Sequence, residues 1–126
     1  MVNKKQQSES HKLAKIIVAG IQEKKGKNIV SINLSKIANS VCNYFVICHG
    51  NSKVQVEAIA DSVEEFVRKS NNDKAWQKEG FENAEWILLD YVDVVVHIFQ
   101  ENIRAFYNLE ELWADAEIKK YKSDED

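Results

Sequence analysis

The sequence predicts an α+β domain, α/β-like in its alternation, with a mixed four-stranded sheet flanked by helices in the order α-β-β-α-β-β-α. Three observations carry this prediction. Residues 30–34 alternate apolar and polar side chains, which is typical of a strand buried on one face. Residues 44–48 (YFVIC) form a short apolar run, which indicates a central strand covered on both sides. Residues 86–99 hold two apolar runs separated by a polar turn, which indicates a hairpin.

The first helix is predicted ahead of these strands. Apolar side chains recur at helical spacing in residues 13–21, and Ser8 or Ser10 can cap the start. Residues 24–26 (KKG) suit the end of a helix, because basic side chains and glycine favour that position.

A capping box, Ser52 followed by Gln55, predicts the start of the second helix, whose apolar side chains share one face. The turn Gly50-Asn51-Ser52 offers an alternative, because unpaired N–H groups at a helix N-terminus can hold a phosphate. With one glycine and no adjacent Lys-Ser/Thr pair, this signal is far weaker than a P-loop, and it favours plain capping.

The second half of the chain predicts a hairpin and a last helix. Polar residues 70–85 are expected to form an exposed connection, after which strands at residues 86–89 and 94–99 pair around a tight Asp-Tyr-Val-Asp turn. Apolar side chains at helical spacing in residues 103–107 predict the last helix, and Asn108 can cap a further turn.

The length of 126 residues predicts one domain, with a composition of 44% hydrophobic and 29% charged residues that is typical of globular proteins. We place the domain at residues 10–116, between a flexible basic arm at residues 1–9 and a charged tail at residues 117–126. Cys42 and Cys48 are expected to be buried rather than paired or metal-bound.

Charge is distributed unevenly along the chain. Residues 1–36 hold eight Lys against two Glu, whereas residues 37–126 hold nine basic against eighteen acidic side chains. Without a concentrated basic face beyond the N-terminal lysines, we expect no sequence-specific nucleic-acid binding. The acidic body suits a basic protein partner, or is a solvated surface without one. No run is apolar enough for a membrane span and the start lacks signal features, so we expect a cytoplasmic protein.

The stretch DYVDVVVHIF (residues 90–99) raises the question of a catalytic or metal site, because it holds Asp90, Asp93 and His97. On a strand Asp93 and His97 share a face, but four residues separate their Cα atoms by roughly 13 Å. That separation is too large for both to bind one metal ion. Carboxylates beside a turn usually accept backbone N–H bonds. A buried His97 needs a hydrogen-bond partner or water.

These residues leave three classes of function open. A nucleotidyltransferase-like enzyme would hold a phosphate at Gly50-Asn51-Ser52 and Mg²⁺ at Asp90 and Asp93, although the nearby sequence is short of Lys and Arg. A homodimeric scaffold is another class. Aromatic residues near the hairpin are more numerous than a small core readily hides, which favours the third class, a protein with a docking surface.

Three long segments resemble the ribosomal silencing factor (RsfS) family of Iojap-related proteins. They read NYFVICHGNSKVQVEAIADSV, EGFENAEWILLDYVDVVVHIF and RAFYNLEELWADA, in the family's order and with its separations. The segments cover most of residues 10–116. The resemblance implies a mixed sheet flanked by helices, related in outline to nucleotidyltransferases but without their catalytic equipment.

The same resemblance implies a non-enzymatic translational repressor that uses no cofactor. Such a protein binds the large ribosomal subunit at its fourteenth protein, on the subunit-joining face. It blocks docking of the small subunit when nutrients are scarce. Free members of the family often form homodimers, so we expect a homodimer away from the ribosome.

The partner-binding region implied by the family surrounds the hairpin. Carried onto this sequence, it comprises Trp86, Asp90, Tyr91, Asp93, His97, Glu79 and Gly80. Asn43, Cys48-His49 and Val92 depart from the family pattern. Val92 stands where the family has Gly, and a β-branched residue resists positive φ, so we expect another turn geometry here.

Overall fold

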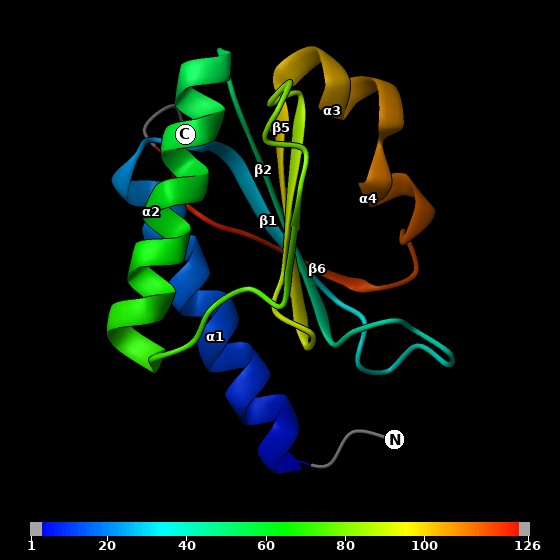
Figure 1. Cartoon of the computed structure of the whole chain (residues 1–126). Helices are drawn as coiled ribbons and strands as arrows, with labels where there is room; N and C mark the ends of the chain where they lie inside the picture. Colours follow the sequence, from blue (N-terminus) through cyan, green and yellow to red (C-terminus); the bar gives the residue numbers. More distant parts are fainter. Residues whose placement is uncertain (1–3, 124–126) are drawn as a thin grey trace.

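A mixed six-stranded sheet with helices on both faces forms the structure, a computed structural model that describes residues 4–123 (Figure 1). The strand order across the sheet is β3-β4-β5-β2-β1-β6. Along the chain the elements are α1 (Lys4–Glu23), β1 (Lys27–Asn33), β2 (Tyr44–Gly50), α2 (Lys53–Asn71), β3 (Gln77–Glu79), β4 (Trp86–Asp90), β5 (Val94–Gln100), α3 (Glu101–Tyr107), α4 (Leu109–Leu112) and β6 (Glu117–Lys120).

The centre of the sheet is the parallel pair β2 and β5, and the other neighbouring strands pair antiparallel. Every residue of β2 is buried, which confirms the prediction of a central strand covered on both sides. The β4–β5 hairpin is also confirmed, with Trp86 opposite Phe99 and Asp90 opposite Val95.

The prediction of a four-stranded sheet is wrong, because β3 and β6 add one strand at each edge. β3 lies inside the polar connection at residues 70–85, and β6 lies in the segment expected to be a charged tail. All side chains of both strands are exposed, so neither strand has the apolar alternation that signals a strand in the sequence. Backbone pairing with β4 and β1 holds them in place.

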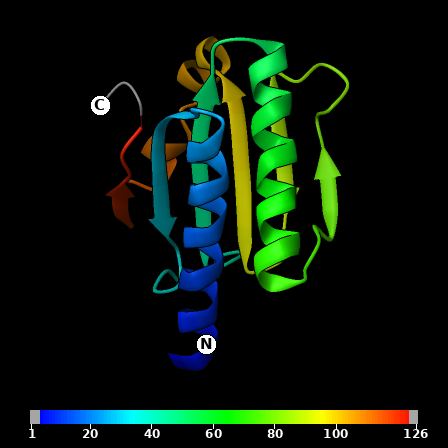
Figure 2. The ribbon, with the colours of Figure 1, turned by 90° about the vertical axis from the view of Figure 1, so that its left-hand side faces the viewer.

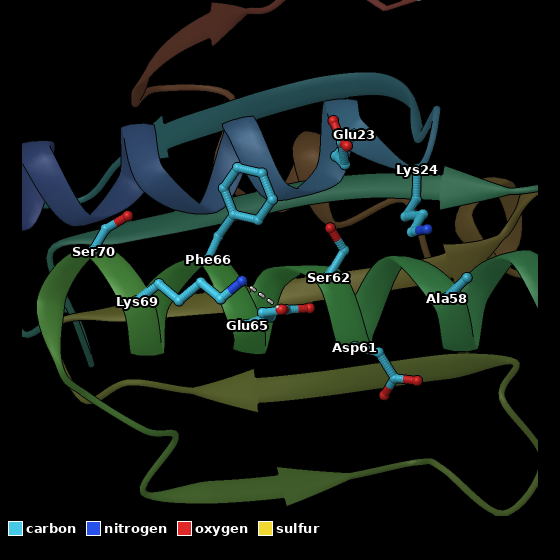
Figure 3. Close-up of a pocket in the computed structure, with 9 residues that line it drawn as sticks. All are labelled: Glu23, Lys24, Ala58, Asp61, Ser62, Glu65, Phe66, Lys69 and Ser70. Atoms are coloured by element: carbon cyan, nitrogen blue, oxygen red, sulfur yellow. Dashed lines mark ion pairs between the residues drawn. The ribbon is translucent and has the colours of Figure 1, made fainter.

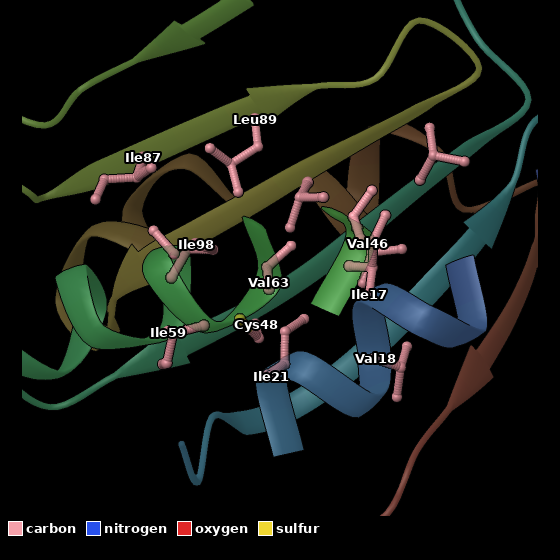
Figure 4. Packing of buried hydrophobic residues seen from close by; sticks show 14 of the residues in the cluster. Ile17, Val18, Ile21, Val46, Cys48, Ile59, Val63, Ile87, Leu89 and Ile98 are labelled. Carbon is pink, nitrogen blue, oxygen red and sulfur yellow. The ribbon is translucent and has the colours of Figure 1, made fainter. Parts of the chain in front are cut away.

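The helices α1 and α2 pack side by side over one face of the sheet (Figure 2). A Cβ on Gly20 would lie 3.0 Å from the Cα of Val63, so this glycine permits the close approach of the two helices. Ser62 Oγ donates a hydrogen bond to the Gly20 carbonyl at 2.8 Å. The core beneath the helices includes Ile17, Val18, Ile21, Val46, Cys48, Ile59, Val63, Ile87, Leu89 and Ile98 (Figure 4).

The first helix begins earlier than predicted, at Lys4 rather than beside Ser8 or Ser10. Ser10 is buried inside the helix, where its Oγ accepts a hydrogen bond from Asn43 Nδ2 at 2.8 Å instead of capping. Part of the expected flexible arm is therefore helical, while residues 1–3 lie outside the described residues. The predicted end is confirmed, since Lys25 takes φ 61 and Gly26 N–H donates to the Ile21 carbonyl.

The start of α2 confirms the predicted capping box. Ser52 Oγ accepts a hydrogen bond from the Gln55 N–H at 3.1 Å, and Gln55 Oε1 accepts one from the Asn51 N–H at 2.8 Å. Side chains of the chain itself thus satisfy N–H groups that an anion would use. Within residues 4–123, every helix is too short or too polar for a membrane span.

Candidate partner-binding face

The sheet face turned away from α1 and α2 carries an aromatic cluster. Because side chains alternate along strands, Trp86 of β4, His97 and Phe99 of β5, and Phe45 of β2 point to the same side. We call these four residues the open face; Phe45, His97 and Phe99 are buried, and Trp86 is the one of the four that is partly exposed. The C-terminal segment covers part of it, with the Trp113 ring 6.0 Å from the Phe45 ring.

Trp86 is half-buried in this cluster and is held from three sides. Its Nε1–H donates a hydrogen bond to His97 Nδ1 at 3.1 Å. Its ring lies between the rings of Phe99 and Tyr107, with centroid distances of 4.8 and 4.9 Å. The indole therefore presents a fixed apolar surface, and its polar atom is already satisfied within the protein.

His97 is a neutral histidine inside the cluster. Only 4% of the residue is exposed, and this burial lowers the pKa of the imidazole to about 4. Because Nδ1 accepts from Trp86, the ring proton belongs on Nε2. That nitrogen is buried and has no hydrogen-bond partner among the described residues. The predicted need of His97 for a partner is met on one nitrogen by Trp86.

Glu79 and Gly80 lie beside Trp86, at the end of β3. Glu79 is exposed and pairs with Leu88 of β4. Gly80 takes φ +89, and a Cβ there would lie only 2.0 Å from the carbonyl oxygen of Trp86. The backbone of the β3–β4 connection therefore requires glycine at this position.

The hairpin turn places two carboxylates at the other end of β4. Asp90 is half-buried, and its Oδ1 accepts a hydrogen bond from the Val92 N–H at 2.8 Å, as expected for a carboxylate beside a turn. Asp93 is exposed, and its backbone carbonyl accepts from the N–H groups of Asn43 and Tyr44. Backbone bonds thus join the turn to the loop before β2.

The turn differs from the prediction for Val92. This residue takes φ 74 although it is β-branched, and the Asp93 N–H donates to the Tyr91 carbonyl at 2.9 Å, which closes a three-residue turn. The expected avoidance of positive φ is therefore wrong. The hydrogen bonds on both sides of the turn outweigh the preference of valine.

Tyr91 points away from the open face. It is 6% exposed and packs in the core beneath α1 and α2, where burial raises the pKa of its hydroxyl. The structure thus brings Trp86 and His97 together on the open face, with Glu79 and Gly80 beside them. Asp90 lies at the far end of β4, four residues or roughly 13 Å from Trp86, and Asp93 lies in the turn beyond it.

Two aromatic residues of α3 that the sequence did not assign to a site extend the cluster. Tyr107 is 49% exposed and contacts Trp86, and Phe106 is 79% exposed and contacts Tyr107 at a ring distance of 5.1 Å. Their spacing in the sequence predicted an amphipathic helix, and Tyr107 was one of the aromatic residues expected near the hairpin, but no local pattern indicated its contact with Trp86.

Buried Arg104 anchors α3 to the sheet. Its Nη1 lies 3.0 Å from His49 Nδ1, and its Nη2 lies 3.1 Å from Glu110 Oε2. A lone arginine in an amphipathic stretch is usually solvated, so the sequence held no signal for this contact.

A hollow on the helical layer, away from this face, has a volume of about 620 Å³ (Figure 3). It is lined by Glu23, Lys24, Ala58, Asp61, Ser62, Glu65, Phe66, Lys69 and Ser70. The ion pair between Lys69 Nζ and Glu65 spans 2.8 Å, and both side chains are mostly exposed. Three acidic and two basic side chains line the hollow, so it has no strong excess of either charge.

The carboxylates of the turn do not assemble with other ligands. Within the part of the chain that the structure describes, no group of three or more His, Cys, Asp or Glu side chains is arranged to hold a metal ion. The Asp90 carboxylate accepts a hydrogen bond from the Val92 N–H, and His97 Nδ1 accepts one from Trp86. The arrangement of these side chains suits contact with another macromolecule through a rigid aromatic surface and a separate acidic turn.

The fold and this face define a small α+β protein whose mixed sheet is covered by paired helices on one side and carries an aromatic cluster on the other. Residues 7–126 match the family described as RsfS, ribosomal silencing factor during starvation. The chain belongs to the ribosomal silencing factor family.

Relatives support this assignment over most of the chain. A ribosomal silencing factor RsfS of Bacillus subtilis is 41% identical over 106 residues, which are 84% of this chain and 88% of the relative. The RsfS of Halalkalibacterium halodurans is 40% identical over 107 residues, or 85% and 90% of the two chains. A crystal structure of a Chromobacterium violaceum protein matches with a TM-score of 0.77 and 33% identity, covering 82% of this chain and 85% of that one.

Proposed function

We propose that this protein binds the large ribosomal subunit at its fourteenth protein, on the subunit-joining face, and blocks docking of the small subunit. Translation is thereby repressed when nutrients are scarce. The observation that carries the proposal is the family match over residues 7–126. The protein acts by occupying space in the cytoplasm, without catalysis or a cofactor, and forms a homodimer when it is free.

The binding surface in this proposal combines the open face with the hairpin turn. Trp86 is the central anchor, because a half-buried indole held by His97 loses little conformational freedom on binding. Glu79 and Gly80 flank this anchor. Asp90, Tyr91 and Asp93 form the turn region, in which Tyr91 shapes the turn from within the core and Asp93 offers its exposed carboxylate.

Charge supports a basic protein as the partner. Residues 37–126 hold twice as many acidic as basic side chains, and complementary potentials accelerate and orient docking. The proposed similarity to nucleotidyltransferases is a similarity of backbone fold and does not extend to catalytic side chains. Of the groups that an enzyme of that type would use, the Asp90 carboxylate accepts a structural hydrogen bond from the Val92 N–H, and the Asn51 N–H donates to Gln55.

Sedimentation with separated subunits tests the proposal. The protein is expected to co-sediment with isolated large subunits and to lower the yield of joined ribosomes when small subunits are added. Trp86→Ala should weaken both effects, whereas Val54→Ala, at a 75% exposed valine at the start of α2, should leave both intact. Association with small subunits alone contradicts the proposal.

A further inference from the structure

The tip of the β4–β5 hairpin exposes a valine in a backbone conformation that valine rarely adopts. Val92 has φ 74 and is 58% exposed, and the hydrogen bond from the Asp93 N–H to the Tyr91 carbonyl closes the turn around it. Three-residue turns with a positive central φ are rare and strained, and β-branched residues are especially disfavoured there.

The surroundings of the turn impose this conformation. Asp90 Oδ1 holds the Val92 N–H, the Asp93 carbonyl accepts two N–H groups from the loop before β2, and the Tyr91 N–H donates to the Val94 carbonyl. A glycine could make the same backbone hydrogen bonds without strain. The fold therefore does not need the two methyl groups of Val92, because hydrogen bonds fix the backbone of the turn and the side chain is mostly exposed.

A second exposed valine lies close to this tip. Val41, in the loop before β2, is 79% exposed and lines the same hollow of about 640 Å³ as Val92 and Asp93. We call Val41, Val92 and Asp93 the tip surface. Lys36 also lines the hollow, while the carboxylates of Asp90 and Asp93 flank Val92 in the chain. The negative charge is thus concentrated at the hairpin.

We propose that Val92 is a docking residue that inserts into an apolar depression flanked by Lys or Arg side chains on the large-subunit protein bound by the open face. The inference rests on the proposed function. Backbone strain persists at positions where it serves binding, and a rigid side chain costs little conformational entropy when it docks. The flanking carboxylates repel phosphates, so the tip surface fits a basic protein rather than RNA.

Two substitutions separate the strain of Val92 from its side chain. Val92→Gly removes both, so its melting temperature should not fall, yet its affinity for isolated large subunits should drop about 5- to 30-fold. Val92→Ala keeps an L-residue at φ 74 and should lose affinity without gaining stability. Val54→Ala is the matched control, because Val54 is 75% exposed at the start of α2, on the helical layer.

The outcomes are distinguishable from failure of the proposed function. If both Val92 variants bind as tightly as the unsubstituted protein while Trp86→Ala binds weakly, the role of Val92 is overturned and the proposed function stands. If the unsubstituted protein does not bind large subunits, both proposals fall. Binding to deproteinised large-subunit RNA that weakens in Val92→Ala would overturn the assignment of a protein as the occupant.

Discussion

At the residue scale, the indole of Trp86 serves the fold and the surface at once. Its Nε1–H donates the hydrogen bond that His97 Nδ1 accepts, and its ring contacts the rings of Phe99 and Tyr107. The rest of the side chain is partly exposed. Trp86 contributes to stability and, in the proposed function, also to binding, so the effect of truncating it on one cannot be separated from its effect on the other. Substitutions that remove one contribution at a time are therefore more informative.

Trp86→Phe should lower the free energy of unfolding by about 1–3 kcal/mol, because His97 then keeps no hydrogen-bond partner on either ring nitrogen. Urea unfolding measures this loss.

Trp86→Ala should also weaken binding to large subunits by ~2 kcal/mol or more. A binding titration measures this effect. Trp76→Ala should change stability by less than about 0.5 kcal/mol. Full unfolding of Trp86→Ala would mean that the residue is mainly core.

His97 makes stability depend on pH. The pKa of its imidazole is lowered from 6.5 to about 4 by burial, so between these values the unfolded chain binds a proton that the folded chain does not. The contribution of neutral His97 to the free energy of unfolding is complete above about pH 6.5. It is lost as the pH falls toward about 4, and the total loss is up to about 3 kcal/mol.

His97→Gln tests this pH dependence, because a glutamine oxygen can still accept from Trp86 but cannot titrate. Urea unfolding measures the free energy of unfolding at about pH 7 and at about pH 5. The decrease between these two pH values should be larger for the unsubstituted protein than for the variant, by roughly 2 kcal/mol. Equal losses would mean that His97 is protonated alike in both states.

At the scale of elements, the short connection from β3 to β4 depends on one glycine. Gly80→Ala should lower the free energy of unfolding by roughly 1–3 kcal/mol, because φ +89 and the Trp86 carbonyl leave no room for a Cβ. Thermal melting measures the loss. Gly50→Ala is the control, since its nearest neighbours are side-chain atoms of Gln55 at 3.1 Å or more, and it should cost less. Equal losses would show that the connection tolerates a side chain.

Sequence patterns predicted the elements that bury apolar side chains and missed those that do not. β1, β2, β4 and β5 each carry buried residues, and their alternation or apolar runs announced them. β3 and β6 are exposed throughout and form because neighbouring strands offer unpaired backbone groups. The start of α1 was also missed, because Ser10 resembles a cap but is tied to Asn43.

At the scale of the whole molecule, the candidate site was only partly predictable. Period-2 alternation placed His97 on a face correctly, but the inward orientation of Tyr91 depends on the turn that follows β4. The contact of Tyr107 with Trp86 joins α3 to β4, and such long-range contacts leave no local pattern in the sequence. The separation of Trp86 from the acidic turn likewise emerges only from the folded sheet.

In the proposed function, the carboxylates of the turn act through long-range attraction, whereas Val92 makes the close contact. Asp93 is exposed, and its structural hydrogen bonds use the backbone carbonyl, so Asp93→Asn removes a charge without disturbing the turn. A charge at the rim of an interface mainly affects the association rate. Its field reaches about 30 Å at about 0.01 M salt but only about 8 Å at about 0.15 M.

Asp93→Asn should therefore slow association with isolated large subunits chiefly at low salt, by roughly 2-fold or more, while the dissociation rate changes little. Stopped-flow measurements at low and high salt provide the comparison. Asp61→Asn is the matched control, because Asp61 is exposed on α2, on the face opposite Trp86. If Asp93→Asn associates as fast as the unsubstituted protein at both salt concentrations, the carboxylate does not steer docking, and the turn contributes through its backbone and the Val92 side chain alone.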